Sequence, residues 1–233
     1  MRIGCLSRVR PRCLVTCASA APPRLYCAPL PTSRLTLSAE ESKHATRVLR
    51  LRTGDGVELF DGDGGCLEAK IVSVDARGYA DVEPSGHLRR VPWVGPRWSI
   101  AVACTGLTQR ADWAVEKCCE LGVATFTPLL TERTDGRKQQ RAEQSAEYQR
   151  WGRLSIAASK QCLRLHALKL APPTPLTELL PVVRASSLTL VALQGGAPVR
   201  ELLAAHSGAA SSGGLLVVGP PVSKPHSVRG HAL

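Results

Sequence analysis

The feature that most restricts the fold is an alternation of apolar and helical segments in the second half of the chain. Residues 99–104 (SIAVAC) and 123–128 (VATFTP) have the apolar character of buried strands, and a helical pattern that ends at Gly122 separates them. A strand, a helix and a strand in this order indicate a parallel βαβ unit. Residues 188–193 and 215–218, on either side of the helical segment PVRELLAA, repeat the alternation. We therefore predict an α/β domain with a parallel sheet.

Two helices of this domain carry apolar residues at helical spacing. The helix before Gly122 is expected to present one apolar face, made of Trp113, Ala114, Cys118 and Leu121. A longer helix, from about residue 142 to 163, is expected to present another, made of Trp151, Leu154, Ala158 and Cys162. We expect both faces to pack against the sheet.

The preceding part of the chain, up to residue 96, has the pattern of a small β-rich domain with one helix. Ser38 and Glu41 have the spacing of a capping box at the start of the helix, which ends at the turn of residues 54–56. Short strand-like segments separated by turn residues follow, and the Pro- and Trp-rich stretch of residues 91–98 has the composition of a linker. This pattern predicts a compact barrel or sandwich-like module.

The charge of the chain favours a polyanionic partner. Thirty Lys and Arg residues against nineteen Asp and Glu give a net charge of +11. His44, Arg47 and Arg50 lie on the predicted helix and Arg52 lies just after it; arginine can bind phosphate through two parallel hydrogen bonds. These residues are candidate RNA contacts. A solvated helix face is the alternative explanation.

The first residues have the composition of a targeting segment. Residues 1–39 hold six Arg, and no acidic residue precedes Glu40. The apolar core of a secretory signal is missing, so the segment is more typical of an organellar transit peptide. We predict a transit peptide at residues 1–22 and import into the chloroplast, with the mitochondrion as the alternative.

Several functional classes lose support from the sequence. The five cysteines beyond residue 27 include no C-x-x-C pair, and Cys162 and His166, four residues apart, have no second pair of ligands, so neither a disulfide scaffold nor a metal site is predicted. Phosphate-loop, dinucleotide-binding and nucleophile-elbow motifs are absent. No apolar run reaches the roughly 18 residues that a membrane span needs, and we expect no membrane association.

Six short segments, in this order and spacing, carry a family resemblance: RLY (residues 24–26), HATRVLR (44–50), LFDG (59–62), DWAVEKCCELG (112–122), TPLLTER (127–133) and AASKQCLRLH (157–166). Together they resemble the RsmE-type methyltransferases, which modify uridine N3 in small-subunit rRNA. The segment KQCLRLH is similar to the plant and algal branch of that family.

The resemblance implies a PUA-like β-barrel domain at residues 23–96 and a SPOUT α/β methyltransferase domain at residues 97–220 that ends in a trefoil knot. It implies S-adenosylmethionine as the cofactor, small-subunit rRNA as the substrate and a homodimer as the assembly. Arg24 and the helix of residues 44–50 would bind rRNA.

The resemblance also implies the residues of the reaction centre. Gln161 and Arg164 would lie near it, and Gly219 and Pro220 would hold the cofactor. Arg164 could stabilise the anion that develops when uracil N3 loses its proton. The alternative is that Arg164 only caps the C-terminus of a helix.

The last residues depart from the family pattern. Pro221 stands where the family has Glu, and residues 222–233 do not resemble the Leu-Gly-Pro stretch of the knot. We therefore expect a truncated or mis-spliced family member with a non-family tail at residues 221–233, an incomplete knot and an incomplete cofactor site. The alternative function is that of a non-catalytic rRNA-binding fragment.

Overall fold

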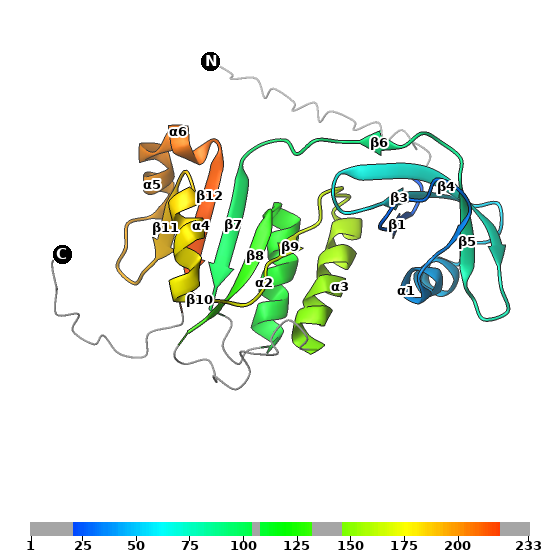
Figure 1. Cartoon of the computed structure of the whole chain (residues 1–233), viewed down its shortest axis with the longest axis horizontal. Helices are drawn as coiled ribbons and strands as arrows, with labels where there is room; N and C mark the ends of the chain where they lie inside the picture. Colours follow the sequence, from blue (N-terminus) through cyan, green and yellow to red (C-terminus); the bar gives the residue numbers. More distant parts are fainter. Residues whose placement is uncertain (1–20, 104–107, 132–145, 220–233) are drawn as a thin grey trace, which may run out of the picture.

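The structure is a computed structural model that describes residues 21–103, 108–131 and 146–219. Two six-stranded sheets, one in each half of the chain, form separate domains joined by residues 91–96 (Figure 1). The predicted transit peptide lies outside the described residues, apart from Ala21 and Pro22. The predicted tail of residues 221–233 lies wholly outside them.

The N-terminal domain is built on a largely antiparallel sheet. Only β1 and β3 pair in parallel, and the other pairs are antiparallel. Leu25, Leu59 and Ile71 are among the fully buried residues of its core. The order across the sheet is β1 (Arg24–Tyr26), β3 (Gly56–Phe60), β4 (Gly65–Val74), β5 (Ala80–Pro84) and β2 (Leu35–Thr36), with β6 (Arg89–Arg90) beside β4.

The predicted helix of this domain is shorter than expected and changes type. Helix α1 covers Ala39–Lys43, and a π-helical turn, η1 (His44–Val48), continues it. The predicted N-cap is confirmed, because the Ser38 hydroxyl accepts the Glu41 backbone N–H at 3.2 Å. The chain leaves the turn at Arg50, whose φ of 57° lies in the left-handed region.

The C-terminal domain confirms the predicted α/β alternation, because every strand pair in its sheet is parallel. The strand order is β10 (Thr174–Pro175), β8 (Thr125–Leu130), β7 (Arg97–Val102), β12 (Gly213–Val218) and β11 (Thr189–Ala192), with β9 (Lys169–Leu170) beside β8. The short strands of two or three residues each, namely β1, β2, β6, β9 and β10, were not predicted.

Helices cover both faces of this sheet. Successive residues of a strand point to opposite sides of the sheet, so each strand supplies apolar side chains to both faces. Phe126 faces α2 (Thr108–Leu121) and α3 (Ala146–Gln161), where it meets the ring of Trp151 edge-on at 6.0 Å. Ala101, Leu215 and Val217 face the other side, which η3 (Leu176–Leu179) and α4 (Leu180–Ala185) cover. Helices α5 (Val199–Ala205) and α6 (Ser207–Ala210) lead into β12 (Figure 1).

The predicted apolar face of α2 is confirmed for Cys118, which is buried, and for Ala114, which packs partly against the core, but it is wrong for the two larger residues. Trp113 is 62% exposed and Leu121 is 80% exposed. The buried face is instead made of smaller residues, namely Ala111, Val115, Cys118 and Cys119. On α3 the prediction is better, because Trp151 and Ala158 are buried and Leu154 packs partly against the same core.

Candidate functional site

Three of the predicted RNA contacts form an exposed cationic surface on the N-terminal domain. Arg47, Arg50 and Arg52 are all exposed, at the end of η1 and in the loop that follows it. The backbone N–H of Arg52 donates to the Asp55 carboxylate at 2.7 Å, which fixes the course of this loop. We call these three residues the arginine cluster. Their guanidinium groups are accessible to a phosphate backbone.

His44 lies beside the arginine cluster but has a different character. Its side chain is partly buried, and this burial, followed by the charge of Lys160, lowers the pKa of His44 below its ordinary value of 6.5. The imidazole is therefore neutral at pH 7. His44 can offer a hydrogen bond there but adds no positive charge.

Arg24 is engaged inside the domain. Its side chain is 13% exposed and forms an ion pair with Glu58, and its guanidinium carbon lies 5.9 Å from the centre of the Phe60 ring. Arg89 approaches the other oxygen of Glu58 at 3.1 Å. The structure therefore places Arg24 in a packed polar network that joins β1 to β3, whereas the arginine cluster is exposed.

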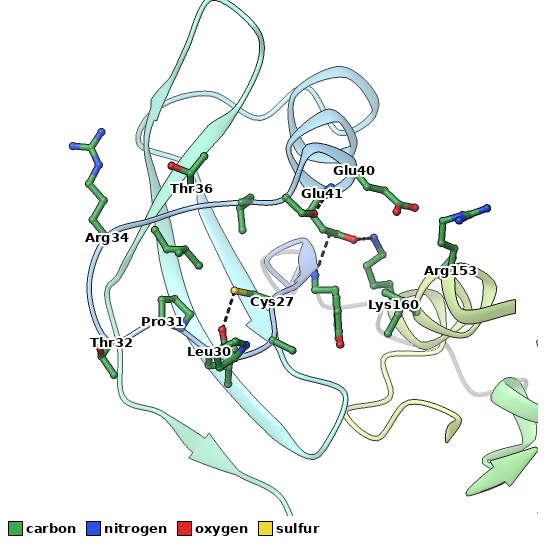
Figure 2. Close-up of a pocket in the computed structure, with 18 of the residues that line it drawn as sticks. Cys27, Leu30, Pro31, Thr32, Arg34, Thr36, Glu40, Glu41, Arg153 and Lys160 are labelled. Carbon is green, nitrogen blue, oxygen red and sulfur yellow. Dashed lines mark hydrogen bonds and ion pairs between the residues drawn. The ribbon is translucent and has the colours of Figure 1, made fainter. Parts of the chain in front are cut away.

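Sequence reasoning missed two cations that face the N-terminal domain from α3. Arg153 and Lys160 are seven residues apart, a spacing that places them on one side of a helix. They line one wall of a cleft of about 820 Å³, whose opposite wall is the segment of residues 26–41 (Figure 2). Lys160 points at Glu41 across this cleft, and Arg153 extends from the same helix (Figure 2).

Gln161 and Arg164 lie at the edge of the parallel sheet where its strands begin. Gln161 is the exposed last residue of α3. Arg164 donates through Nη2 to the backbone carbonyl of Glu120 at 3.1 Å, and its guanidinium fills the space beside Gly122, just before β8. This contact satisfies a carbonyl in the last turn of α2. Arg164 therefore caps the C-terminus of a helix, as the alternative role proposed from the sequence requires, but it caps α2 and not α3, the helix that precedes it in the chain.

Gly219 lies at the opposite edge of the sheet, directly after β12. The Ala103 N–H donates to the Val218 carbonyl at 2.9 Å, so the ends of β7 and β12 stay paired up to this point. Among the described residues, no atom lies within 4 Å of a Cβ placed at Gly219, and the residue is exposed. In open α/β sheets this carboxyl edge is where ligands bind. Pro220 lies outside the described residues.

The structure therefore does not bring the two predicted halves of the reaction centre together in one chain. Arg164 lies next to Gly122, before β8, whereas Gly219 follows the far end of β12, and both strands run parallel through β7. A strand of six residues spans about 20 Å. A guanidinium at one edge cannot contact a group held at the other edge of the same sheet.

His166 has a structural environment. Its Nε2 lies 2.9 Å from the Val91 carbonyl, and its ring meets that of Trp93 edge-on at 5.2 Å. Within residues 21–103, 108–131 and 146–219, no three His, Cys, Asp or Glu side chains gather as a metal site would require. In the same part of the chain, no helix is both long and apolar enough to cross a membrane.

Comparison with known families assigns both domains. Residues 96–221 match an RNA methyltransferase domain, and residues 37–84 match an RNA methyltransferase PUA domain. Two curated relatives are named ribosomal RNA small subunit methyltransferase E. The Buchnera aphidicola protein is 27% identical over 128 residues, which cover 55% of this chain and 49% of that protein. The Synechocystis protein is 31% identical over 140 residues, which cover 60% of this chain and 43% of that protein. The chain thus spans about half the length of the curated relatives it matches.

Solved structures share the two-domain fold. A probable rRNA methyltransferase from Porphyromonas gingivalis has a TM-score of 0.68 at 24% identity, over 85% of this chain and 79% of that one. A ribosomal RNA small subunit methyltransferase E from Neisseria gonorrhoeae, solved with S-adenosyl methionine bound, has a TM-score of 0.66 at 21% identity, over 84% and 78%. These likenesses confirm the predicted PUA domain followed by a SPOUT α/β domain. Because the methyltransferase match covers more than half of its residues, the chain belongs to the RsmE-type RNA methyltransferase family.

Proposed function

We propose that this protein is an S-adenosylmethionine-dependent methyltransferase that acts on uracil N3 of small-subunit rRNA. The observation that carries the proposal is the match of an RNA methyltransferase domain to residues 96–221, the segment that folds into the parallel sheet. The names of the curated relatives support rRNA as the substrate. The direct test is incubation of the full chain with unmodified small-subunit rRNA and labelled S-adenosylmethionine, with the product mapped by mass spectrometry. Methylation at a uracil carbon or at a ribose would contradict the proposed chemistry.

The methyl donor would lie at the carboxyl edge of the sheet, against the exposed Gly219. S-adenosylmethionine supplies an electrophilic methyl group on a sulfonium, and the acceptor N3 must lose its proton before or during transfer. Titration with S-adenosylhomocysteine tests this placement. If the cofactor site is complete, a Gly219→Trp variant should lose binding, whereas Gly152→Trp, in the middle of α3, should keep it. If the site is incomplete, as the sequence predicts, the wild type itself should not bind.

RNA recognition is proposed for the arginine cluster of Arg47, Arg50 and Arg52. Each phosphate contact that is lost should lower the dependence of log affinity on log salt concentration by about one unit for duplex RNA regions. The triple Arg→Gln variant should therefore bind a small-subunit rRNA fragment more weakly and with a flatter salt dependence. Arg77, on an exposed turn of the same domain, serves as the matched control. Equal slopes for the triple variant and the wild type would rule out phosphate contacts by the cluster.

A homodimer is proposed because Arg164 can reach a methyl donor at Gly219 only from a second copy of the chain. Mixing Arg164→Ala and Gly219→Trp proteins distinguishes the two arrangements. If the residues act across copies, half of the dimers are mixed and each has one intact site, so activity returns to about a quarter of wild type. If both residues act within one copy, every site carries one defect and mixing restores nothing.

Organellar import is proposed from the Arg-rich, acid-free composition of residues 1–22. A fluorescent protein fused to residues 1–30 should collect in the chloroplast or the mitochondrion. Cytosolic fluorescence would refute this proposal without affecting the others.

A further inference from the structure

Within the described residues, the contacts between the two domains include a backbone pairing with an exposed Asp63–Lys169 ion pair beside it, and a second ion pair that is largely buried. The first is a backbone pairing between the turn of residues 62–64 and the segment of residues 165–167. The Gly64 N–H donates to the Leu165 carbonyl at 3.1 Å, and the Ala167 N–H donates to the Gly62 carbonyl at 2.9 Å. These two backbone hydrogen bonds hold the two domains together along one line. They resist a rotation of one domain about that line only weakly.

The second contact is a largely buried ion pair between α1 and α3. Lys160 Nζ lies 2.7 Å from Glu41 Oε1, and the two side chains are 14% and 6% exposed. The other oxygen of Glu41 accepts the backbone N–H of Tyr26 at 3.1 Å. Glu41 thus joins α1 to β1 inside its own domain while it holds Lys160 of the other domain (Figure 2). The capping-box residue predicted from the sequence has its carboxylate at the domain boundary.

The space around this ion pair is poorly filled. The cleft of about 820 Å³, which Glu41 and Lys160 both line, lies on one side of the contact between the domains, and an open depression of about 480 Å³, which neither of them lines, lies between Tyr26 and the same helix, α3. Both are lined by Gly152 and Ile156. Interfaces held by close apolar packing resist reorientation, whereas a hollow interface leaves the orientation to its few specific contacts.

We propose that Lys160 is a positioning residue: its ion pair with Glu41 spans the cleft and sets the angle of the RNA-binding domain relative to the methyltransferase domain. This inference rests on the proposed RNA-binding function. Residues 62–64 and 165–167 act as the hinge, and the Glu41 to Lys160 contact acts as the latch. A buried ion pair contributes little net stability, but the protein loses much stability when one partner is removed and the other charge stays buried. Such a pair is therefore suited to fixing one geometry.

Hydrogen exchange of the full chain tests the latch without RNA. Lys160→Met removes the charge but keeps the aliphatic stem, and we expect exchange of residues 24–43 and 152–160 to rise about tenfold through local opening. Exchange of Gly64 and Ala167, at the hinge, should stay near the wild-type rate. Lys160→Arg keeps the charge and should behave as the wild type. The matched control is Lys169→Met, which removes an exposed ion pair of 3.1 Å with Asp63 at the same boundary.

A second variant guards against a folding defect in Lys160→Met. Glu41→Gln keeps an oxygen that can accept the Tyr26 N–H, and the unpaired Lys160 can extend into the solvent-filled cleft. The same loosening of residues 152–160 is expected. Wild-type exchange in both Lys160→Met and Glu41→Gln would overturn the proposal.

The RNA affinity of these variants shows whether Glu41 and Lys160 act by positioning the domain or only through their charge. Glu41→Gln removes a negative charge, which on electrostatic grounds alone should strengthen binding to a small-subunit rRNA fragment. If Lys160 and Glu41 position the domain, the variant should instead bind several-fold more weakly, and Lys169→Met should bind more tightly than Lys160→Met. Stronger binding by Glu41→Gln would overturn the functional part of the proposal. If the wild type itself fails to bind RNA, the proposed function fails, while the exchange experiment still decides the latch.

Discussion

Arg24 offers a sharp test, because the family resemblance implies that it contacts RNA and the structure places it in a packed network. Its guanidinium forms an ion pair with Glu58 and lies over the Phe60 ring, and the side chain is 13% exposed. The Arg24→Met variant removes the charge but keeps most of the packing volume. It leaves the Glu58 carboxylate, itself 14% exposed, with Arg89 as its remaining cation.

The size of the effect follows from these contacts. Removing one partner of a fully buried pair costs about 3 to 5 kcal/mol, and a hydrogen bond to a charged group contributes about 1.5 to 3 kcal/mol. Because Arg89 still pairs with Glu58, we expect a loss below that of a fully buried pair and within the range of a hydrogen bond to a charged group, about 2 kcal/mol of unfolding free energy. For a chain of this length that corresponds to a fall in Tm of roughly 4 to 8 °C.

Thermal unfolding and RNA titration, measured on the same variants, decide between the two roles. Arg24→Met should lower the Tm and change RNA affinity less than twofold under conditions where the protein stays folded. The exposed Arg47→Met should do the reverse. An Arg24→Met protein with wild-type Tm and weakened RNA binding would refute the structural role.

Three further predictions concern stability. The pKa of Asp81 is lowered from 3.8 to about 2 by hydrogen bonds from Thr36, Arg34 and Ser73; a carboxyl group with a depressed pKa stabilises the fold above pH 3.8, and this contribution should disappear as the pH falls from 4 to 2. Asp81→Asn should flatten the pH dependence of Tm in that window alone. Gly122 has a φ of 82°, and a Cβ there would lie 2.5 Å from Arg164 Nη1, so Gly122→Ala should cost roughly 1 to 2 kcal/mol and break the Arg164 contact with Glu120, as chemical denaturation can measure. Phe126→Ala should cost about 3 to 5 kcal/mol and alter the tryptophan fluorescence, because Phe126 is fully buried against Trp151; a loss below 1 kcal/mol would show that this core can collapse around the cavity.

The alternation of strands and helices was predictable because it depends on local signals. The apolar segments that became β7, β8, β11 and β12 are short and bounded by turn residues, as buried parallel strands require. The two-residue strands β9 and β10 carry no such signal, since pairing with β8 alone defines them. The face of α2 was misjudged because Trp113 and Leu121 are the bulkiest apolar residues, whereas close approach to the sheet favours Ala111 and Cys119.

The candidate site was less predictable, because its decisive contacts join distant residues. Arg24 meets Glu58 across 34 positions, and Lys160 meets Glu41 across 119. In the sequence, none of these four charged residues can be told apart from a charged residue on the solvent-exposed surface. The arginine cluster was predictable because its members lie within six positions of each other and share a local exposed turn. Sequence reasoning therefore locates surface charge well and paired charge poorly.

The attachment of the N-terminal domain has a consequence for how RNA reaches the methyl donor. The linker enters the parallel sheet at Arg97, the first residue of β7, and the second connection, through Ala167 and Gly62, comes just before β9. Both connections therefore lie at the edge where the strands begin. Gly219 follows the end of β12, at the other edge. The proposed RNA domain and the proposed donor site of one chain are thus separated by the length of the strands. In the proposed homodimer, a second copy related by a twofold axis would place its own RNA domain at the carboxyl edge of the first, and the same arrangement would bring Arg164 of that copy there.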